Sequence, residues 1–291
     1  MAGYREPYVV VGAKGMLGTD LVRLMLESGI ATIPLDVPEL DIRNMNSTME
    51  VLAAFKPGLI INVAAVTDVD GCESNVEEAF SVNGYGAANV AEAARACGAF
   101  LIHMSTDYVF DGNKGSPYQE SDSVNPLGVY GKSKAQGEAA ISALLPESHC
   151  IVRTQWLFGP HGKNFVEAIL GAAQQREILK VVNDQQGSPT YSVDLAEALI
   201  KLGNIGATGV VHVTNSGQTT WYHFARRIVE QAAVKNVRVV PIKTEELGRP
   251  APRPAYSVLD NARFVQITGA PLRNWEEALV EYLQRRSEVM A

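Results

Sequence analysis

Residues 8–18 read YVVVGAKGMLG, and this stretch decides the fold. The run of valines predicts a buried strand over residues 8–11, and the apolar spacing behind it predicts a helix over residues 16–26. Gly12, Gly15 and Gly18 fill the turn between them. Glycines let a backbone approach a pyrophosphate closely, and a helix N-terminus offers unpaired N–H groups to the same anion. The stretch therefore predicts a dinucleotide site, and a merely tight strand-to-helix turn is the alternative.

The same alternation of strands and helices continues along the chain. Further strands are expected over residues 30–35, 59–63, 100–104 and 150–152, with helices over residues 87–96 and 132–145. Continuous apolar strands separated by helices are typical of a parallel sheet that is covered on both faces. The predicted fold class is therefore α/β, a Rossmann-type doubly wound parallel sheet with a smaller C-terminal lobe.

The composition of the sequence changes after Arg153, where proline and glycine become more frequent. Residues 1–153 are therefore expected to form the NAD(P)-binding domain, and residues 154–291 mainly a substrate-binding lobe. Helical patterns over residues 193–202 and 221–233 suggest that the chain passes between the two parts. Segments at about residues 190–215 are expected to return to the Rossmann domain.

Bulk composition excludes several classes of protein. The chain has 291 residues and a formal net charge of −7, without a basic run, which argues against nucleic acid as a partner. No apolar stretch has the length of a signal peptide or a membrane span, so a cytoplasmic protein without a membrane partner is expected. The cysteines and histidines lack metal-ligand spacing, and no metal site is predicted. Cys97 and Cys150 are expected to be buried, and Cys72 partly exposed.

Acidic residues follow the second expected strand. Asp36 stands where a carboxylate accepts hydrogen bonds from the adenosine ribose. Its charge repels the 2′-phosphate of NADP while Lys14 attracts it, so use of NADH with NADPH tolerated is expected. Asp41 and Ile42 are expected to border the adenine, and a helix N-cap is the other interpretation of Asp41.

A hydroxyl, a phenol and an ammonium occur in the order that a carbonyl reductase needs. Thr106 lies in the run STDYVFDG (residues 105–112), and Tyr130 and Lys134 share a face of an expected helix. The Tyr-x-x-x-Lys spacing alone is weak, because ten tyrosines and ten lysines give about 0.3 chance matches. With the glycine turn upstream, we predict that Tyr130 donates a proton and that Lys134 lowers its pKa and binds the nicotinamide ribose.

Other interpretations of these residues stay open. Tyr130 as a buried aromatic residue and Lys134 as a surface charge are the alternatives to the catalytic pair. Thr106 is expected to hydrogen-bond to the substrate carbonyl. Asn83 is expected either to orient Lys134 or to cap a helix.

Together these motifs resemble the extended short-chain dehydrogenase/reductase superfamily and, more closely, its dTDP-4-dehydrorhamnose reductase family. The resemblance covers nearly the whole chain. It rests on GAKGMLG (12–18), NVAAVTDVD (62–70), STDYVFDG (105–112), PLGVYGKSK (126–134), RTQWLFG (153–159), NDQQGSPT (183–190) and RPAYSVLD (253–260).

The resemblance implies reduction of the C4 ketone of a dTDP-6-deoxy-4-hexulose to dTDP-L-rhamnose, with NADH or NADPH as cofactor and the dTDP-sugar as partner. It implies that Trp156, Thr106, Asp107 and Tyr108 contact the sugar and that Arg253 lies near the diphosphate. A core position for Trp156 and a surface salt bridge for Arg253 are the alternatives. By the same resemblance the cofactor is lined by Gly12, Gly15, Met16, Leu17, Gly18, Asp36, Asp41, Ile42, Ala64, Ala65, Val66, Thr67, Asn83, Tyr130 and Lys134. The oligomeric state stays open, with a homodimer as one option.

Related functions fit parts of the same pattern. The nucleotide-sugar 4,6-dehydratases carry Asp-Glu after the catalytic threonine, whereas this chain has Asp107-Tyr108, so dehydration is disfavoured. Another nucleotide-sugar 4-ketoreductase or an epimerase would share the Tyr/Lys pair. The non-catalytic regulatory β subunit of methionine adenosyltransferase shares the DYVFDG and YGK-x-K segments. Residues 153–159 and 183–190 resemble the reductases instead, and reduction is the predicted function.

Overall fold

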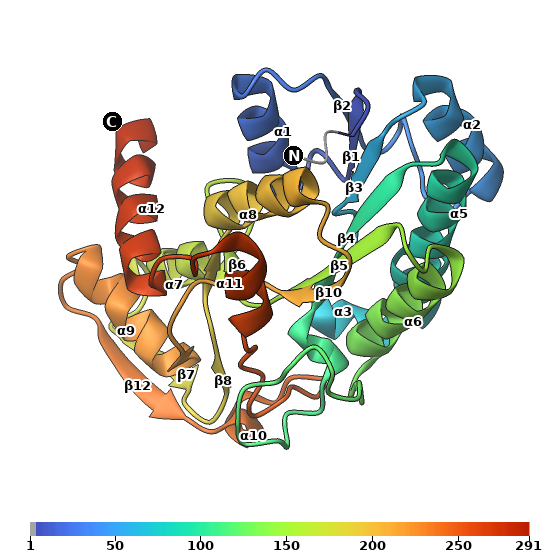
Figure 1. Cartoon of the computed structure of the whole chain (residues 1–291). Helices are drawn as coiled ribbons and strands as arrows, with labels where there is room; N and C mark the ends of the chain where they lie inside the picture. The colour runs from blue at the N-terminus through green and yellow to red at the C-terminus, as the bar shows by residue number, and fades with distance from the viewer. Residues whose placement is uncertain (1–3, 291) are drawn as a thin grey trace.

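A six-stranded parallel sheet forms the centre of the larger domain (Figure 1). The computed structural model describes residues 4–290, with side chains described through Arg286. The strand order is β10-β5-β4-β3-β1-β2, and every neighbouring pair is parallel. The strands are β1 (Tyr8–Val11), β2 (Thr32–Leu35), β3 (Leu59–Asn62), β4 (Phe100–Thr106), β5 (His149–Thr154) and β10 (Gly209–His212).

Helices cover both faces of this sheet because alternate residues of each strand point to opposite sides. Val9 and Ile60 pack with α2 (Met45–Phe55), α5 (Ala87–Cys97) and α6 (Val129–Leu144). Val10 and Ile61 pack with α1 (Met16–Glu27) and α8 (Ser192–Ile205) on the other face. The prediction of a doubly wound α/β fold is therefore confirmed.

Two predicted boundaries differ from the structure in ways that affect the site. Strand β4 continues to Thr106, two residues beyond the predicted end, because Ser105 and Thr106 pair with the last residues of β5. Helix α6 starts at Val129 rather than at residue 132, with Gly128 as its N-cap. Thr106 thus belongs to a strand, and Tyr130 lies in the first turn of a helix.

The smaller lobe is built from short strand pairs and helices around an aromatic core. Its pairs are β7 (Ile178–Val182) with β12 (Arg238–Ile242), β8 (Gln186–Gly187) with β11 (Thr219–Thr220), and β6 (Leu157–Phe158) with β9 (Thr190–Tyr191). Helices α7 (Phe165–Ala173), α9 (Trp221–Gln231) and α12 (Trp275–Met290) enclose Phe158, Tyr191, Phe224, Trp275 and Tyr282. In Figure 1 this lobe lies to one side of the six-stranded sheet.

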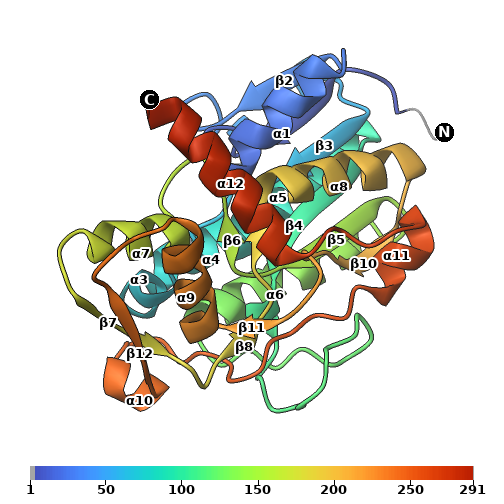
Figure 2. The ribbon, with the colours of Figure 1, turned by 90° about the vertical axis from the view of Figure 1, so that its left-hand side faces the viewer.

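The chain crosses between the lobes more than once. Helix α8 packs against α1, and β10 then adds the edge strand beside β5 (Figure 2). Before α12 completes the lobe, residues near Leu259 return to form a bridge with Tyr118. The remaining helical segments are α3 (Val69–Ser74), α4 (Val76–Phe80), the π-helix η1 (Ser81–Gly86), the 3-10 turn η2 (Asp107–Val109), α10 (Thr244–Leu247) and α11 (Ala262–Thr268).

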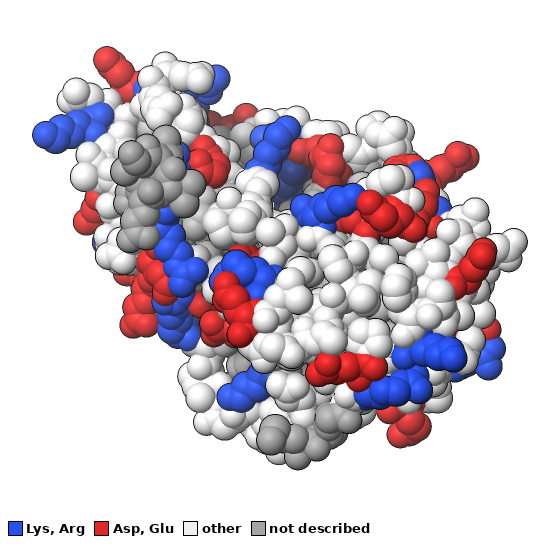
Figure 3. Space-filling view, turned by 90° about the horizontal axis from the view of Figure 1, so that it is seen from above, with Lys and Arg blue, Asp and Glu red and all other residues white. Residues whose placement is uncertain are grey.

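The surface carries charges of both signs. On the face shown in Figure 3, lysines and arginines are interspersed with aspartates and glutamates. Within residues 4–290, every helix is too short or too polar to cross a lipid bilayer.

Candidate active site

The glycine turn after β1 leaves room for a ligand at the backbone. Gly12 has φ +86°, and a Cβ atom there would lie 2.6 Å from the backbone nitrogen of Ala64. A Cβ atom on Gly18 would lie 2.1 Å from the carbonyl oxygen of Gly12. Helix α1 begins with Gly15 as its N-cap and without a side-chain cap, so its first N–H groups are free for an anion. The turn fits the pyrophosphate of a dinucleotide.

A cavity of about 620 Å³ opens beside this turn at the carboxyl ends of β1, β3 and β4. Open α/β sheets hold their ligands at this edge. The cavity brings together most of the predicted site residues, namely Gly12, Gly15, Met16, Leu17, Gly18, Ala65, Thr67, Thr106, Asp107, Tyr108, Tyr130, Lys134 and Trp156. Its lining does not include Asp36, Asp41, Ile42, Ala64, Val66, Asn83 or Arg253.

Thr106 joins three groups at the end of β4. Its Oγ1 accepts a hydrogen bond from the backbone N–H of Tyr108 at 3.2 Å and donates one to Oδ1 of Asp107 at 3.0 Å. The phenol of Tyr130 also hydrogen-bonds to Thr106. Thr106 and Asp107 are 5% and 1% exposed, whereas Tyr130 is half-buried. The three side chains form one hydrogen-bonded chain that faces the cavity.

Burial raises the pKa of Tyr130, the nearby Asp107 raises it further, and the hydrogen bond to Thr106 opposes the shift. The Lys134 ammonium contacts Met104 and His103 in this structure, and its effect on the pKa of Tyr130 stays a prediction. A raised pKa keeps the phenol protonated at neutral pH, which is the form that donates a proton to an alkoxide.

Lys134 is 2% exposed, so its interpretation as a surface charge is wrong. Its Nζ donates to the carbonyl oxygen of Met104 at 2.6 Å and lies 3.2 Å from Nε2 of His103. Burial lowers the pKa of Lys134 to about 8, and burial together with the Lys134 charge lowers the pKa of His103. On its other side, Nδ1 of His103 lies 3.2 Å from Nδ2 of Asn62. Sequence reasoning missed His103, although a histidine inside the apolar run of residues 100–104 is a signal.

Asn83 does not cap a helix, and its predicted part in orienting Lys134 stays a prediction. Its Oδ1 accepts from the backbone N–H of Val66 at 2.9 Å, and its Nδ2 donates to the Val66 carbonyl at 3.0 Å and to Oγ of Ser133 at 3.1 Å. The N-cap of α5 is Gly86, and Lys134 contacts Met104 and His103 directly. The Asn83 amide therefore hydrogen-bonds to both backbone groups of Val66, in the segment after β3, and to Ser133 of α6. It links these two parts of the chain.

Asp36 lies at the end of β2 and contacts the glycine turn directly. Its Oδ2 accepts from the backbone N–H of Lys14 at 2.8 Å. The Lys14 ammonium extends past it to Oε2 of Glu39 at 3.0 Å. Asp36 and Lys14, the two residues that were expected to influence the 2′-phosphate of NADP, therefore lie side by side. The carboxylate of Glu39 forms an ion pair with Lys14.

The N-cap interpretation of Asp41 is wrong. Helix α2 is capped by Asn44, whose side chain accepts from the backbone N–H of Ser47. Asp41 forms an ion pair with Arg43 at 2.6 Å instead. Ile42, between them, is 4% exposed and packs in the core beneath α2 and α5.

Trp156 adopts a backbone conformation that is rare for a residue with a side chain. Its φ is +48°, and its ring stacks on Trp221 with centroids 3.7 Å apart. A Cβ atom on Gly187 would lie 2.5 Å from this ring, so only glycine fits there. The ring is half-buried and lines the cavity, which places it between the two predicted interpretations. Trp221 itself was not predicted as part of the site.

Arg253 does not reach the cavity. Its two terminal nitrogens donate to the carboxylate of Asp70 at 3.0 and 2.9 Å, and Arg249 adds a third contact at 3.1 Å. Arg253 also hydrogen-bonds to Tyr108, which does line the cavity. The salt-bridge interpretation describes Arg253, although the pair is only about one-fifth exposed.

Several further residues line the cavity that sequence reasoning did not select. They are Val63, Val69, Met104, Ser105, Thr154, Gln155, Leu157, Gly162 and Lys163. Lys163 adds a cation to the lining, from the loop between β6 and α7. Cys72 also differs from expectation, because it is buried while Cys97 is partly exposed. Across the described residues, histidine, cysteine and carboxylate side chains form no cluster of three or more that could hold a metal ion.

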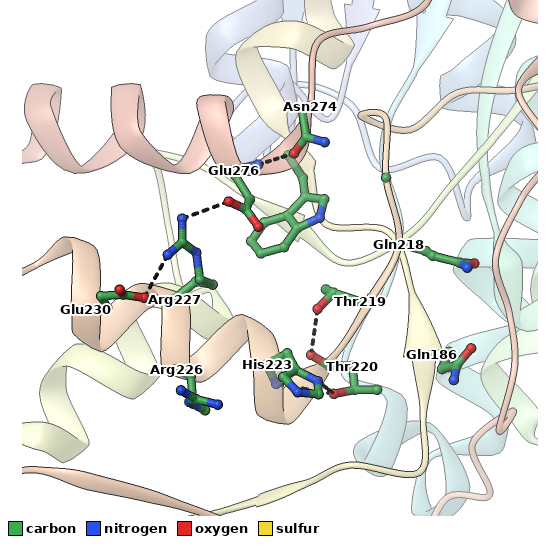
Figure 4. Close-up of a pocket in the computed structure, with 12 residues that line it drawn as sticks. Gln186, Gln218, Thr219, Thr220, His223, Arg226, Arg227, Glu230, Asn274 and Glu276 are labelled. Carbon is green, nitrogen blue, oxygen red and sulfur yellow. Dashed lines mark hydrogen bonds and ion pairs between the residues drawn. The ribbon is translucent and has the colours of Figure 1, made fainter.

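A second cavity, of about 730 Å³, lies in the smaller lobe beside α9, β11 and the start of α12 (Figure 4). Arg227 lies between Glu230 and Glu276 and pairs with each at 2.7 Å. None of the predicted site residues lines this cavity.

Comparisons with known proteins agree over almost the whole chain. Residues 7–288 match the family described as RmlD substrate binding domain. The chain is 42% identical to a dTDP-4-dehydrorhamnose reductase of Aggregatibacter actinomycetemcomitans, over 93% of this chain and 96% of that protein. It is 39% identical to a dTDP-4-keto-6-deoxy-D-glucose reductase of Streptomyces niveus, over 95% of this chain and 96% of that protein.

A solved structure shows the same fold. The dTDP-4-dehydrorhamnose reductase of Bacillus anthracis, in complex with NADP, superposes with a TM-score of 0.93 at 37% identity and covers 97% of this chain and 99% of that one. The motifs, the fold and these matches agree, and the family prediction is confirmed: the chain belongs to the dTDP-4-dehydrorhamnose reductase family, a family of oxidoreductases.

Proposed function

We propose that this protein reduces the C4 ketone of dTDP-4-dehydro-β-L-rhamnose to dTDP-L-rhamnose, with NADH or NADPH as the hydride source. The observation that carries the proposal is the hydrogen-bonded chain of Tyr130, Thr106 and Asp107 in one cavity with the glycine turn. The names of relatives that are about 40% identical support it, and the NADP in the Bacillus anthracis protein supports the cofactor class.

We assign each residue of the site a separate role in the reduction. A nicotinamide cofactor held at the glycine turn would supply the hydride for the sugar carbon. Tyr130 gives its proton to the carbonyl oxygen, and Thr106 hydrogen-bonds to the same oxygen and orients the phenol. Lys134, held by Met104 and His103, is placed to bind the nicotinamide ribose. A protonated phenol is required for this direction of reaction, which agrees with its raised pKa.

Substrate and cofactor approach from opposite sides of this centre. We assign the six-stranded sheet with α8 and β10 to cofactor binding, and the smaller lobe mainly to the sugar nucleotide. Trp156, held by Trp221 and Gly187, provides an apolar face for the sugar ring. Asp36 favours a free ribose hydroxyl over a 2′-phosphate, and NADH use with NADPH tolerated follows.

A second candidate is reduction of a different dTDP-4-keto-6-deoxy sugar. The relative from Streptomyces niveus carries such a name at nearly the same identity as the rhamnose-type reductases. Both reactions use the same Tyr130, Thr106 and cofactor, and differ in the face of the sugar that meets the nicotinamide.

The test follows the absorbance of the reduced cofactor with purified protein. The dTDP-4-keto sugar is generated in place from dTDP-glucose by the 4,6-dehydratase, with or without the 3,5-epimerase. Oxidation of NADH or NADPH that requires both upstream enzymes supports the rhamnose reaction. Oxidation without the epimerase supports the second candidate. Cofactor binding without oxidation in either mixture would contradict both and would favour an epimerase or a regulatory subunit.

A further inference from the structure

Lys14 is the one charged residue of the glycine turn, residues 12–18. Its backbone N–H donates to Oδ2 of Asp36 at 2.8 Å. Its ammonium donates to the carbonyl oxygen of Val37 at 2.9 Å and to Oε2 of Glu39 at 3.0 Å. The Lys14 side chain therefore lies along the segment that follows β2, and Glu39, which sequence reasoning did not select, is its ionic partner.

Asp36 is held in a fixed orientation beside the turn. Its Oδ1 accepts from the backbone N–H of Val37 at 2.8 Å, and its Oδ2 accepts from the backbone N–H of Lys14. A carboxylate has about four acceptor positions, so each oxygen keeps one for a hydroxyl of the adenosine ribose. A ribose bound in this way has its 2′ position next to Asp36, and a phosphate at that position lies close to Lys14 and Glu39.

The neighbouring sequence offers a second cation, but that cation is already engaged. Arg43 is the one lysine or arginine in residues 36–44. It forms ion pairs with Asp41 at 2.6 Å and with Glu78 at 3.2 Å. Lys14 is therefore the cation of this region that a 2′-phosphate would meet first.

We propose that Glu39 sets the preference between NADH and NADPH, because it neutralises the Lys14 ammonium that would otherwise bind the 2′-phosphate. The proposal rests on the cofactor class of the function proposed above. The 2′-hydroxyl of NADH donates to Asp36 and leaves the Lys14–Glu39 pair intact. NADPH carries a phosphate of about −1.5 to −2 charges at this position. Glu39 repels that phosphate, and Lys14 must leave Glu39 to reach it.

The geometry makes this a preference rather than an exclusion. The side chains of Lys14 and Glu39 are 60% and 55% exposed, and exposed ion pairs are weak. The pair therefore opens at low cost when a phosphate attracts Lys14. A backbone hydrogen bond and the Lys14 side chain lower the pKa of Glu39, so the repelling charge is present at neutral pH.

The test compares cofactor binding to the wild type and to Glu39→Gln, measured by fluorescence titration with NADPH and with NADH. The substitution should lower Kd for NADPH by about fivefold, the factor for one unit charge about 4 Å from another in water. Kd for NADH should stay within about twofold, because its ribose hydroxyl meets Asp36. In a Lys14→Met background, Glu39→Gln should produce a smaller gain for NADPH, because no ammonium is released.

The matched control is Glu27→Gln. Glu27 is 58% exposed and pairs with Arg23 at 3.0 Å, at the end of α1 that is remote from the glycine turn. This variant has the same net charge as Glu39→Gln, and its ratio of NADPH to NADH affinity should equal that of the wild type.

A second pair of probes isolates the phosphate. Adenosine 2′,5′-bisphosphate and AMP differ only in the 2′-phosphate, and calorimetry measures the binding of each. Glu39→Gln should strengthen binding of the bisphosphate alone, and the gain should shrink as salt is added.

Four outcomes overturn the proposal: an unchanged Kd for NADPH in Glu39→Gln, an equal gain for NADPH and NADH, an equal gain with and without Lys14, or a wild-type protein that binds neither cofactor. Failure of the reductase function is distinguishable from all of these. It appears as a protein that binds both cofactors, with the expected response to Glu39→Gln, yet oxidises neither of them in the presence of the dTDP-4-keto sugar.

Discussion

At the scale of single residues, the decisive placement is that of Tyr130 at the start of α6, where its phenol meets Thr106. We expect Tyr130→Phe to lower kcat by about 10²–10⁴-fold, because the hydroxyl is the proposed proton donor. Cofactor affinity should remain nearly unchanged, since the ring and the neighbouring Lys134 stay in place. Steady-state kinetics and a fluorescence titration with the reduced cofactor measure the two effects. An unchanged kcat would remove Tyr130 from the mechanism.

The second residue-scale prediction concerns Trp156, which holds an unusual backbone conformation while its ring stacks on Trp221. Strained residues of this kind concentrate at functional sites. We expect Trp156→Ala to raise KM for the sugar nucleotide by about 10-fold or more, through loss of the apolar face, with a smaller change in kcat. Trp156→Phe, which keeps an aromatic ring, is the matched control. If KM stays level and only Tm falls, the residue serves the core alone.

At the scale of elements, a buried ion pair joins α6 to β5 beneath the site. Arg153 donates to Glu138 at 2.9 and 2.6 Å, and both side chains are less than one-tenth exposed. Glu138 also accepts from Ser105 of β4, so three elements meet at one carboxylate.

We expect Glu138→Ala to lower the free energy of unfolding by about 3–5 kcal/mol, because it leaves the Arg153 charge buried without a partner. Urea denaturation measures the change. Glu92→Ala, which removes an ion pair with the exposed Arg95, is the control and should cost about 1 kcal/mol or less. Equal losses in the two variants would show that the buried pair has no special role.

At the scale of the whole molecule, β10 connects the lobes, and His212 lies at its end. Its Nδ1 contacts the carbonyl of Tyr118 at 3.1 Å, and its Nε2 lies 3.4 Å from Arg153. Burial is the largest cause that lowers the pKa of His212, to about 3, and the Arg153 charge adds to it. The folded protein therefore holds this histidine neutral, whereas the unfolded chain binds a proton below about pH 6.5.

This difference in proton binding sets the direction in which the free energy of unfolding changes with pH. The contribution of His212 to stability is present above pH 6.5 and is lost as the pH falls toward 3, at about 1.4 kcal/mol per pH unit. His103 acts in the same direction, whereas Asp107, whose pKa is raised, acts oppositely between about pH 7 and pH 4. To isolate His212, urea denaturation of the wild type is compared with His212→Gln at pH 7 and pH 5. The stability advantage of the wild type should shrink by about 2 kcal/mol at the lower pH. His223→Gln, a substitution at an exposed histidine, is the control, and its free energy of unfolding should change with pH as that of the wild type does. The same pH dependence in His212→Gln as in the wild type would contradict a buried neutral His212.

The sequence by itself determined the strand, the glycine turn and the helix predicted within residues 8–26, the fold class and the family. It also selected Thr106, Tyr130 and Lys134, which do share one cavity. These features depend on residues that are close together in the chain, where periodicity and spacing are visible. Only the tertiary structure placed His103 against Lys134, Trp221 beneath Trp156, and Arg253 on Asp70 rather than in the cavity. Arg253 and Asp70 are 183 positions apart, and no local pattern records such a contact. The His103–Lys134 contact depends on how α6 packs against β4. The other two contacts depend on how segments of the smaller lobe meet the residues that follow β5 and β3.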